Sequence, residues 1–163
     1  MPAEKRFVVD SMLGKVAKWL RAMGFETRYQ HVEDLQQLDE HAQQGYHVVT
    51  RNSRWVNHPA TVWVTADDPR EQLREIVAAL KIVPAEVRPF CRCLRCNELL
   101  QTVDRALVAG HVPDYVYENS TVFHQCPQCR QVYWAGSHPS HMVDWLHATL
   151  GWRFSSNPQG GSP

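Results

Sequence analysis

Four of the five cysteines form two Cys-x-x-Cys pairs, in the segments CLRC and CPQC. The pairs are Cys93 with Cys96 and Cys126 with Cys129. Two residues between two thiolates allow a tight turn that aims both sulfurs at one ion, and two such pairs fit a tetrahedral zinc site. A redox pair or four unrelated thiols are the alternatives, and two matched pairs argue against both. Because four thiolates leave no open position for a substrate, a zinc ion held here is predicted to be structural.

The remaining cysteine and the histidines suggest no further site. Cys91 is offset from the first pair, and we interpret it as a bystander. His138 and His141 lie three residues apart in the last expected helix and could share one of its faces. We interpret both as surface or packing residues. The sequence does not define the roles of these three residues.

A second group of candidate residues is acidic and lies next to expected strands. Asp10 directly follows a buried strand, Asp34 precedes a polar helix, and Asp67 follows another strand. The carboxyl ends of parallel strands meet at one edge of a sheet, where ligands bind. Each carboxylate has a simpler interpretation as a helix cap. Together, however, they predict a site for Mg²⁺ or Mn²⁺ that could position water against a phosphodiester, with basic side chains nearby at Lys15, Arg51 and Arg54.

The first part of the chain alternates strand and helix patterns. The segments RFVV, FETRY, YHVVT and TVWVT are typical of strands, because they are rich in β-branched and aromatic residues. Between and after them, MLGKVAKWLRAM, DLQQLDEHAQQ and DDPREQLREIVAAL have helical spacing or clear helix starts. Strands that alternate with helices predict an α/β fold with a parallel sheet and flanking helices.

The character of the chain changes near Pro84. We predict an α/β domain over residues 1–83, a connector over 84–90, and a Cys₄ zinc-ribbon module with a short terminal helix over 91–150. Little helical pattern separates the two cysteine pairs, so a long hairpin is expected there. The remainder, 151–163, is rich in Gly, Ser and Pro and is expected to be a disordered tail.

The composition narrows the range of functions. The chain has 163 residues, is 44% hydrophobic and carries 17 basic and 17 acidic side chains. A zero net charge argues against a duplex-DNA binder that relies on bulk charge. No apolar run approaches the roughly 18 residues that span a bilayer, and the first residues do not resemble a secretory signal. The expected location is therefore the cytoplasm, with no membrane partner.

Several segments, taken in order, resemble one known family, the carboxy-terminal ribonuclease domain of the Mut-seven exonucleases. They are VVDSMLGKVAKWLRAMGFET, VVTRN, DDPREQL, CRCLRCNELL and FHQCPQCRQVYWAGSH. The resemblance runs from about Phe7 to Leu150 and implies a PIN-like nuclease fold with a zinc ribbon fused behind it.

The resemblance also implies roles for individual residues. Asp10 and Asp34 match the first two acidic positions of the family, and the ribbon ligands match Cys93, Cys96, Cys126 and Cys129. The third acidic position normally follows Thr-Arg, where this chain has Asn52. An amide oxygen can ligate Mg²⁺, but it lacks the charge that offsets desolvation of the ion.

The leading hypothesis is therefore a metal-dependent ribonuclease that acts on single-stranded RNA. Asp10 and Asp34, helped by Asn52 or Asp67, would hold Mg²⁺ or Mn²⁺ at a solvent-facing edge. The residues expected to contact phosphate are Lys15, Thr50, Arg51 and Arg54. The alternative is an RNA- or protein-binding adaptor in which the chemistry is lost at Asn52. A zinc-ribbon interaction protein is a third hypothesis. The RNA preference, endo- or exonucleolytic action and the oligomeric state stay open.

Overall fold

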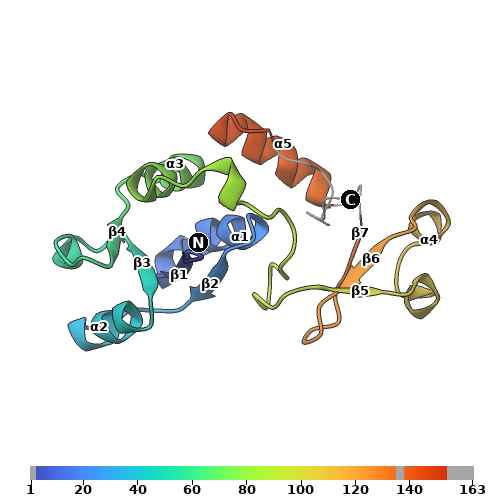
Figure 1. Cartoon of the computed structure of the whole chain (residues 1–163), viewed down its shortest axis with the longest axis horizontal. Helices are drawn as coiled ribbons and strands as arrows, with labels where there is room; N and C mark the ends of the chain where they lie inside the picture. The colour runs from blue at the N-terminus through green and yellow to red at the C-terminus, as the bar shows by residue number, and fades with distance from the viewer. Residues whose placement is uncertain (1–2, 135–137, 154–163) are drawn as a thin grey trace.

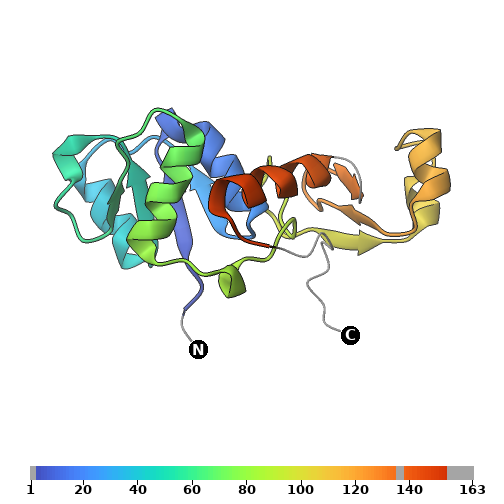
Figure 2. The same ribbon diagram turned by 90° about the horizontal axis from the view of Figure 1, so that it is seen from above.

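The computed structural model describes residues 3–134 and 138–153. An α/β module occupies one end of an elongated molecule and a small β module the other (Figure 1). The last helix, α5 (His138–Leu150), runs between them (Figure 2). No helix among the described residues is both long enough and apolar enough to cross a membrane.

The α/β module is built on a four-stranded parallel sheet, as the sequence predicted. Its strands are β1 (Arg6–Val9), β2 (Glu26–Tyr29), β3 (Tyr46–Thr50) and β4 (Thr61–Trp63), in the order β2-β1-β3-β4. In the register of the sheet, Val9 lies opposite Tyr29 and Val49. The carboxyl ends of β1, β2 and β3 therefore meet at one edge.

Helices cover both faces of this sheet. They are α1 (Gly14–Ala22), which follows the 3₁₀ turn η1 (Ser11–Leu13), α2 (Leu35–Gln43) and α3 (Pro69–Leu80). Alternate strand residues point to opposite faces. Phe7 and Val9 pack with α1 and α3, whereas Val8 and Val48 pack with Leu38 of α2.

Gly24 allows the α/β module to pack against the chain that leads to the second module. It ends the turn after α1 with a φ of +96°. A Cβ atom there would lie 2.4 Å from the carbonyl oxygen of Arg88. The backbone N–H groups of Arg88 and Phe90 donate to Met23 and Ala22 at 2.9 Å and 2.8 Å. Any larger residue at position 24 would disrupt this close approach.

The second module contains a three-stranded antiparallel sheet of β5 (Gln101–Val103), β6 (Phe123–Gln125) and β7 (Val132–Trp134). A long hairpin was expected between the cysteine pairs, and β5 and β6 do pair antiparallel. The connection between these strands contains a 3₁₀ turn, η4 (Arg105–Val108), and a short helix, α4 (Asp114–Asn119), which were not expected. Val108, Val112 and Val116 are buried with Phe123. These three valines come from η4, the turn after it and α4, so no single helical pattern marks them in the sequence.

The helix α5 returns to the α/β module, although the sequence grouped it with the ribbon. Leu146 joins the core formed by α1, α3 and the sheet. Trp145 stacks on Trp19 of α1, with ring centroids 3.7 Å apart and planes 6° from parallel. Met142 packs with Ala22 and the connector residue Phe90. The predicted segments 1–83, 84–90 and 91–150 follow one another along the chain, but they do not separate in space. The helix α5, from the last segment, packs on the α/β module and so joins the two modules.

Candidate functional site

The four paired cysteines lie together, as their spacing predicted. Their sulfur atoms are all within 4.8 Å of one another, and the Sγ atoms of Cys93 and Cys129 are 3.7 Å apart. In a tetrahedron with zinc–sulfur bonds of about 2.3 Å, neighbouring sulfurs are about 3.8 Å apart. The group could therefore hold one structural metal ion such as zinc.

The two cysteine pairs lie on matching turns. The N–H of Asn97 donates to the carbonyl of Cys93, and that of Arg130 donates to the carbonyl of Cys126. Asn97 and Arg130 both have left-handed backbones, with φ of 69° and 66°. Each follows the second cysteine of its pair and reverses the chain. The repeated geometry aims both pairs at one point.

The electrostatics of the cluster favour a cation. Burial disfavours the Cys93 thiolate, but hydrogen bonds from the Tyr133 hydroxyl and from nearby backbone N–H groups outweigh it and lower the pKa of Cys93 to about 7. Burial and hydrogen bonds with neighbouring cysteines raise the pKa of Cys96 to about 12. One thiol of the cluster thus ionises readily and then opposes ionisation of the next. A bound cation would remove that repulsion.

Cys91 does not belong to this group. The converging set contains the four paired cysteines alone. Burial raises the pKa of the Cys91 thiol, which makes it less reactive. The side chains of His138 and His141, left open by the sequence, lie outside the described residues.

Asp10 lies at the carboxyl edge of the sheet but is buried, not solvent-facing as expected. Its side chain is 1% exposed. Its Oδ1 accepts hydrogen bonds from the backbone N–H groups of Ser11 at 2.8 Å and Val32 at 3.3 Å. Its Oδ2 accepts a 2.8 Å hydrogen bond from the Thr50 hydroxyl. The expectation of a solvent-facing carboxylate was wrong, because donors from three strand ends converge on it.

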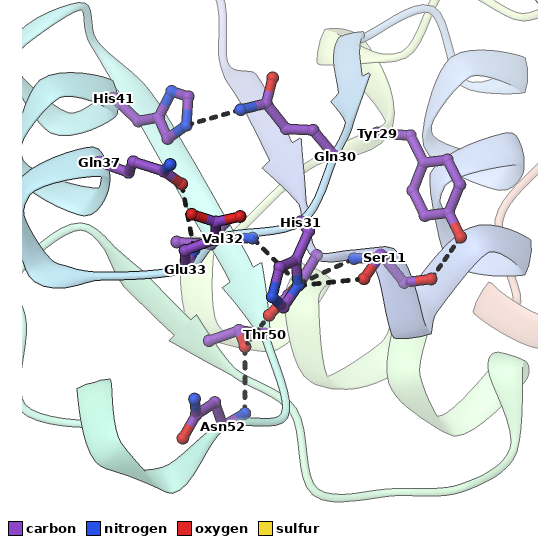
Figure 3. Close-up of polar contacts among 11 residues, drawn as sticks. Ser11, Tyr29, Gln30, His31, Val32, Glu33, Gln37, His41, Thr50 and Asn52 are labelled. Carbon is purple, nitrogen blue, oxygen red and sulfur yellow. Dashed lines mark hydrogen bonds and ion pairs between the residues drawn. The ribbon is translucent and has the colours of Figure 1, made fainter.

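His31 is a neighbour of Asp10 that the sequence did not reveal. Its Nδ1 lies 3.4 Å from Oδ1 of Asp10 and 3.3 Å from the Ser11 hydroxyl, and its side chain is 61% exposed. Figure 3 shows the ring beside Ser11 and near Thr50. His31 belongs to no motif, and its position after β2 was the one available signal. That signal could be used only once β2 was known to lie next to β1.

Asp34 and Asn52 both cap the turns that follow them. Oδ1 of Asp34 accepts from the N–H of Gln37 at 2.9 Å at the start of α2. Oδ1 of Asn52 accepts from the N–H of Arg54 at 3.0 Å, at the start of the 3₁₀ turn η2 (Ser53–Trp55). The Asn52 N–H donates to the Thr50 hydroxyl at 3.0 Å (Figure 3). Hydrogen bonds thus connect Asn52 to Asp10 through the Thr50 hydroxyl. Asp34 has no such connection of its own: it lies two residues after Val32, whose backbone N–H donates to Asp10.

The remaining predicted residues lie around this edge without converging on Asp10. Asp67 is 91% exposed and pairs with Arg51 at 2.5 Å. Arg54 is exposed in η2, and Lys15 is exposed on α1. Asp68 caps α3, and Glu71 in the first turn of that helix pairs with Arg74.

The edge around Asp10 offers one carboxylate to a cation and not a cage of protein ligands. Within the described part of the chain, the cysteines are the only converging group of three or more potential His, Cys, Asp or Glu ligands. Mg²⁺ is commonly bound through one or two carboxylates and several waters. A carboxylate has about four acceptor sites, and Asp10 uses three of them for Ser11, Val32 and Thr50. The remaining acceptor position belongs to a carboxylate that is 1% exposed and has His31 Nδ1 3.4 Å from its Oδ1.

A comparison with known families bears on both sites. A model of the Mut7-C RNAse domain matches residues 5–146. None of the curated proteins matches the chain. The matched span includes the parallel sheet, Asp10 and all four paired cysteines, and its description suggests a nuclease-like function. The chain therefore belongs to the Mut7-C RNAse domain family.

Proposed function

We propose that this protein is a ribonuclease that hydrolyses phosphodiester bonds of single-stranded RNA at the edge around Asp10. The observation that carries the proposal is the position of Asp10, within a chain of the Mut7-C RNAse domain family. Its carboxylate follows β1 at the edge where ligands of parallel sheets bind. Exposed His31 and the strand-end residue Thr50 flank it.

In this proposal the chain's own residues bind and orient the strand. Asp10 is the anchoring carboxylate, and Thr50 and Ser11 fix its two oxygens. A bound Mg²⁺ or Mn²⁺ would supply Lewis-acid polarisation of the phosphate and a more acidic water. Asn52, which Thr50 links to Asp10, is a further candidate ligand. Asp34 and Asp67 could serve only by leaving the α2 cap and the pair with Arg51. The side chains assigned to phosphate contacts are Lys15, Arg51 and Arg54. Thr50, which the sequence also suggested for this role, is buried and its hydroxyl donates to Asp10 instead.

Zinc has a separate, structural part in the proposal. The second module has one small apolar cluster, and four thiolates around one zinc would supply folding energy that this cluster cannot. One zinc per chain is proposed. The reduced cysteines also suit the predicted cytoplasmic location.

The test of the proposal is cleavage of an end-labelled, unstructured RNA by purified protein of known zinc content. Cleavage is expected with Mg²⁺ or Mn²⁺. It should stop when a weak chelator removes these ions and leaves zinc in place. No cleavage with any divalent cation would contradict the proposal.

A second candidate function rests on Asn52. An amide in place of a third carboxylate weakens any cation site, and Asp10 is already engaged by protein donors. The same fold could then bind RNA or a protein without cutting. RNA binding without cleavage by a zinc-loaded sample would favour this adaptor.

A further inference from the structure

The structure has a groove between its two modules. Its volume is about 630 Å³, and it is bordered by α1, the turn of the first cysteine pair, β7 and α5. The guanidinium of Arg21 ties two of these walls together, because its Nη1 donates to the carbonyls of Leu94 at 3.0 Å and Arg95 at 3.3 Å. We call this feature the inter-module groove.

Basic and aromatic residues make up much of its lining. Lys15 and Lys18 of α1 and Arg95 of the cysteine turn line it, and all three are exposed. No carboxylate is found among the described residues of the lining. The aromatic residues of the groove, all of them partly buried, are Trp19, Tyr133, Trp134 and Trp145. Trp19 and Trp145 each have one ring face covered by the other, so a base could stack on them only from their remaining faces. This positive, acid-free surface contrasts with the zero net charge of the chain.

This combination is complementary to a nucleic-acid single strand. Cationic side chains follow the phosphates, while aromatic rings provide surfaces on which unpaired bases stack. A base in a duplex is stacked on its neighbours and is not available to such rings. A groove that offered charge alone would not favour unpaired strands.

The helix α1 connects this groove to the Asp10 edge. Lys15 and Lys18 are exposed and three residues apart, so they lie on one face of α1, and exposed Ser11 lies in the 3₁₀ turn that precedes this helix. Asp10 caps the turn that begins this stretch, and Lys15 and Lys18 line the groove. A strand following that face would pass from the groove to the edge.

From this arrangement we propose that the inter-module groove binds single-stranded RNA and directs the strand along the Lys15–Lys18 face of α1 and past the turn that begins at Ser11 to Asp10. The inference rests on the proposed ribonuclease function, since it names the path of the same substrate. It assigns to Lys18 and Arg95 phosphate contacts away from the Asp10 edge.

The test measures binding of a fluorescent oligouridine without added divalent cations, by anisotropy at several salt concentrations. The variant Lys18→Gln/Arg95→Gln removes two positive charges from the groove. The matched control, Lys81→Asn/Arg88→Gln, removes two exposed charges outside the lining. Asn is used at position 81 because Lys81 has a left-handed backbone with φ of 51°. Circular dichroism and zinc content confirm that both variants are folded.

The groove variant should bind more weakly and lose part of its salt dependence. Each phosphate contact on a single strand contributes about 0.7 to the slope of log affinity against log salt. Loss of two contacts should therefore reduce the ratio of affinities at 50 and 200 mM salt by about sevenfold. The control should match wild type, and a duplex of the same length should bind wild type more weakly than the single strand. Oligouridine should also quench tryptophan fluorescence.

Several results would overturn the inference. These are equal affinities and salt slopes for wild type and the groove variant, an equal loss in the control, or duplex binding as tight as single-strand binding. The ribonuclease proposal can fail separately. If RNA binding depends on the groove but no RNA is cleaved, the groove inference stands and the ribonuclease proposal fails. If RNA is cleaved but the groove variant binds as tightly as wild type, the ribonuclease proposal stands and the groove inference fails.

Discussion

Asp10 caps the turn after β1 and accepts a hydrogen bond from Thr50, and both contacts bear on stability. An amide at position 10 could still accept from Ser11 and Val32 through its oxygen. Its NH₂ group would then face the Thr50 hydroxyl, whose own proton would lose its acceptor. A buried donor without a partner costs about 1–3 kcal/mol.

We therefore predict that Asp10→Asn lowers the free energy of unfolding by about 1–3 kcal/mol. Asp34→Asn is the control, because Asp34 is an exposed cap and Asn caps helices about as well as Asp. Urea unfolding without added divalent cations measures both. Equal stability of Asp10→Asn and wild type would mean that these buried contacts contribute nothing.

Asn52→Asp tests whether residue 52 faces a cation. Asp can cap η2 as Asn does, so the local turn should persist. A further carboxylate should raise Mn²⁺ affinity by about tenfold, equivalent to about 1.4 kcal/mol of added attraction. Without the ion, its repulsion with Asp10 should lower the melting temperature. Calorimetric titration and melts with and without Mn²⁺ measure both effects. If neither changes, residue 52 does not face the ion.

Three histidines should make the protein less stable in mild acid. Burial lowers the pKa of His41, His47 and His124 below their ordinary values. His41 Nε2 also accepts a 3.0 Å hydrogen bond from the Gln30 side chain (Figure 3), which requires an unprotonated nitrogen. Below about pH 6.5 the unfolded chain takes up protons that the folded state resists, so stability falls as pH falls.

The corresponding measurement is the melting temperature between pH 7.5 and 5.5. The melting temperature should decrease steadily as the pH falls from 7.5 to 5.5, and the decrease should be smaller for His41→Asn than for wild type. A melting temperature that does not change over this range would mean that these histidines protonate equally well in both states.

At the scale of elements, the sheet and its helices could be predicted because their signals are local. RFVV and YHVVT are short buried strands, and Asp68 with Pro69 starts α3 as its cap and first residue. The cysteine cluster was also predictable, because two Cys-x-x-Cys pairs in one chain indicate four sulfurs that converge on one metal ion.

Other features depend on contacts between distant segments, which a single sequence does not show. The burial of Asp10 depends on the neighbouring strand end that carries Thr50 and on the segment after β2 that carries His31 and Val32. The helix α4 is only six residues long, so its pattern completes fewer than two turns. The packing of α5 on α1 became visible only in three dimensions.

The two cysteine turns should depend on each other for zinc binding and for folding. Cys96→Ser removes one of four zinc ligands and should reduce bound zinc well below one per chain, with loss of folding in the second module. Cys91→Ser removes a thiol outside the cluster and should keep the full zinc content. Elemental analysis and circular dichroism check both variants. Folded wild-type protein without zinc would contradict the structural metal site.

For the whole molecule, α1 and α5 are the elements that join the Asp10 edge to the inter-module groove. The helix α1 follows the turn that Asp10 caps, and the exposed Lys15 and Lys18 of α1 line the inter-module groove. The stacked Trp19 and Trp145 hold α5 against it, and Arg21 holds the first cysteine turn. The fold thus places the Asp10 edge and a basic, aromatic groove on one continuous scaffold.

The most direct test of this account is single-turnover cleavage of an unstructured RNA in Mn²⁺ by wild type and by Asp10→Asn. Both proteins are assayed at equal zinc content and at a temperature where melts show the variant to be folded. Wild type should cut the strand, and Asp10→Asn should cut it slower by about a hundredfold or more. Equal rates for the two proteins would show that the cleavage does not arise at the Asp10 edge, and would contradict the account.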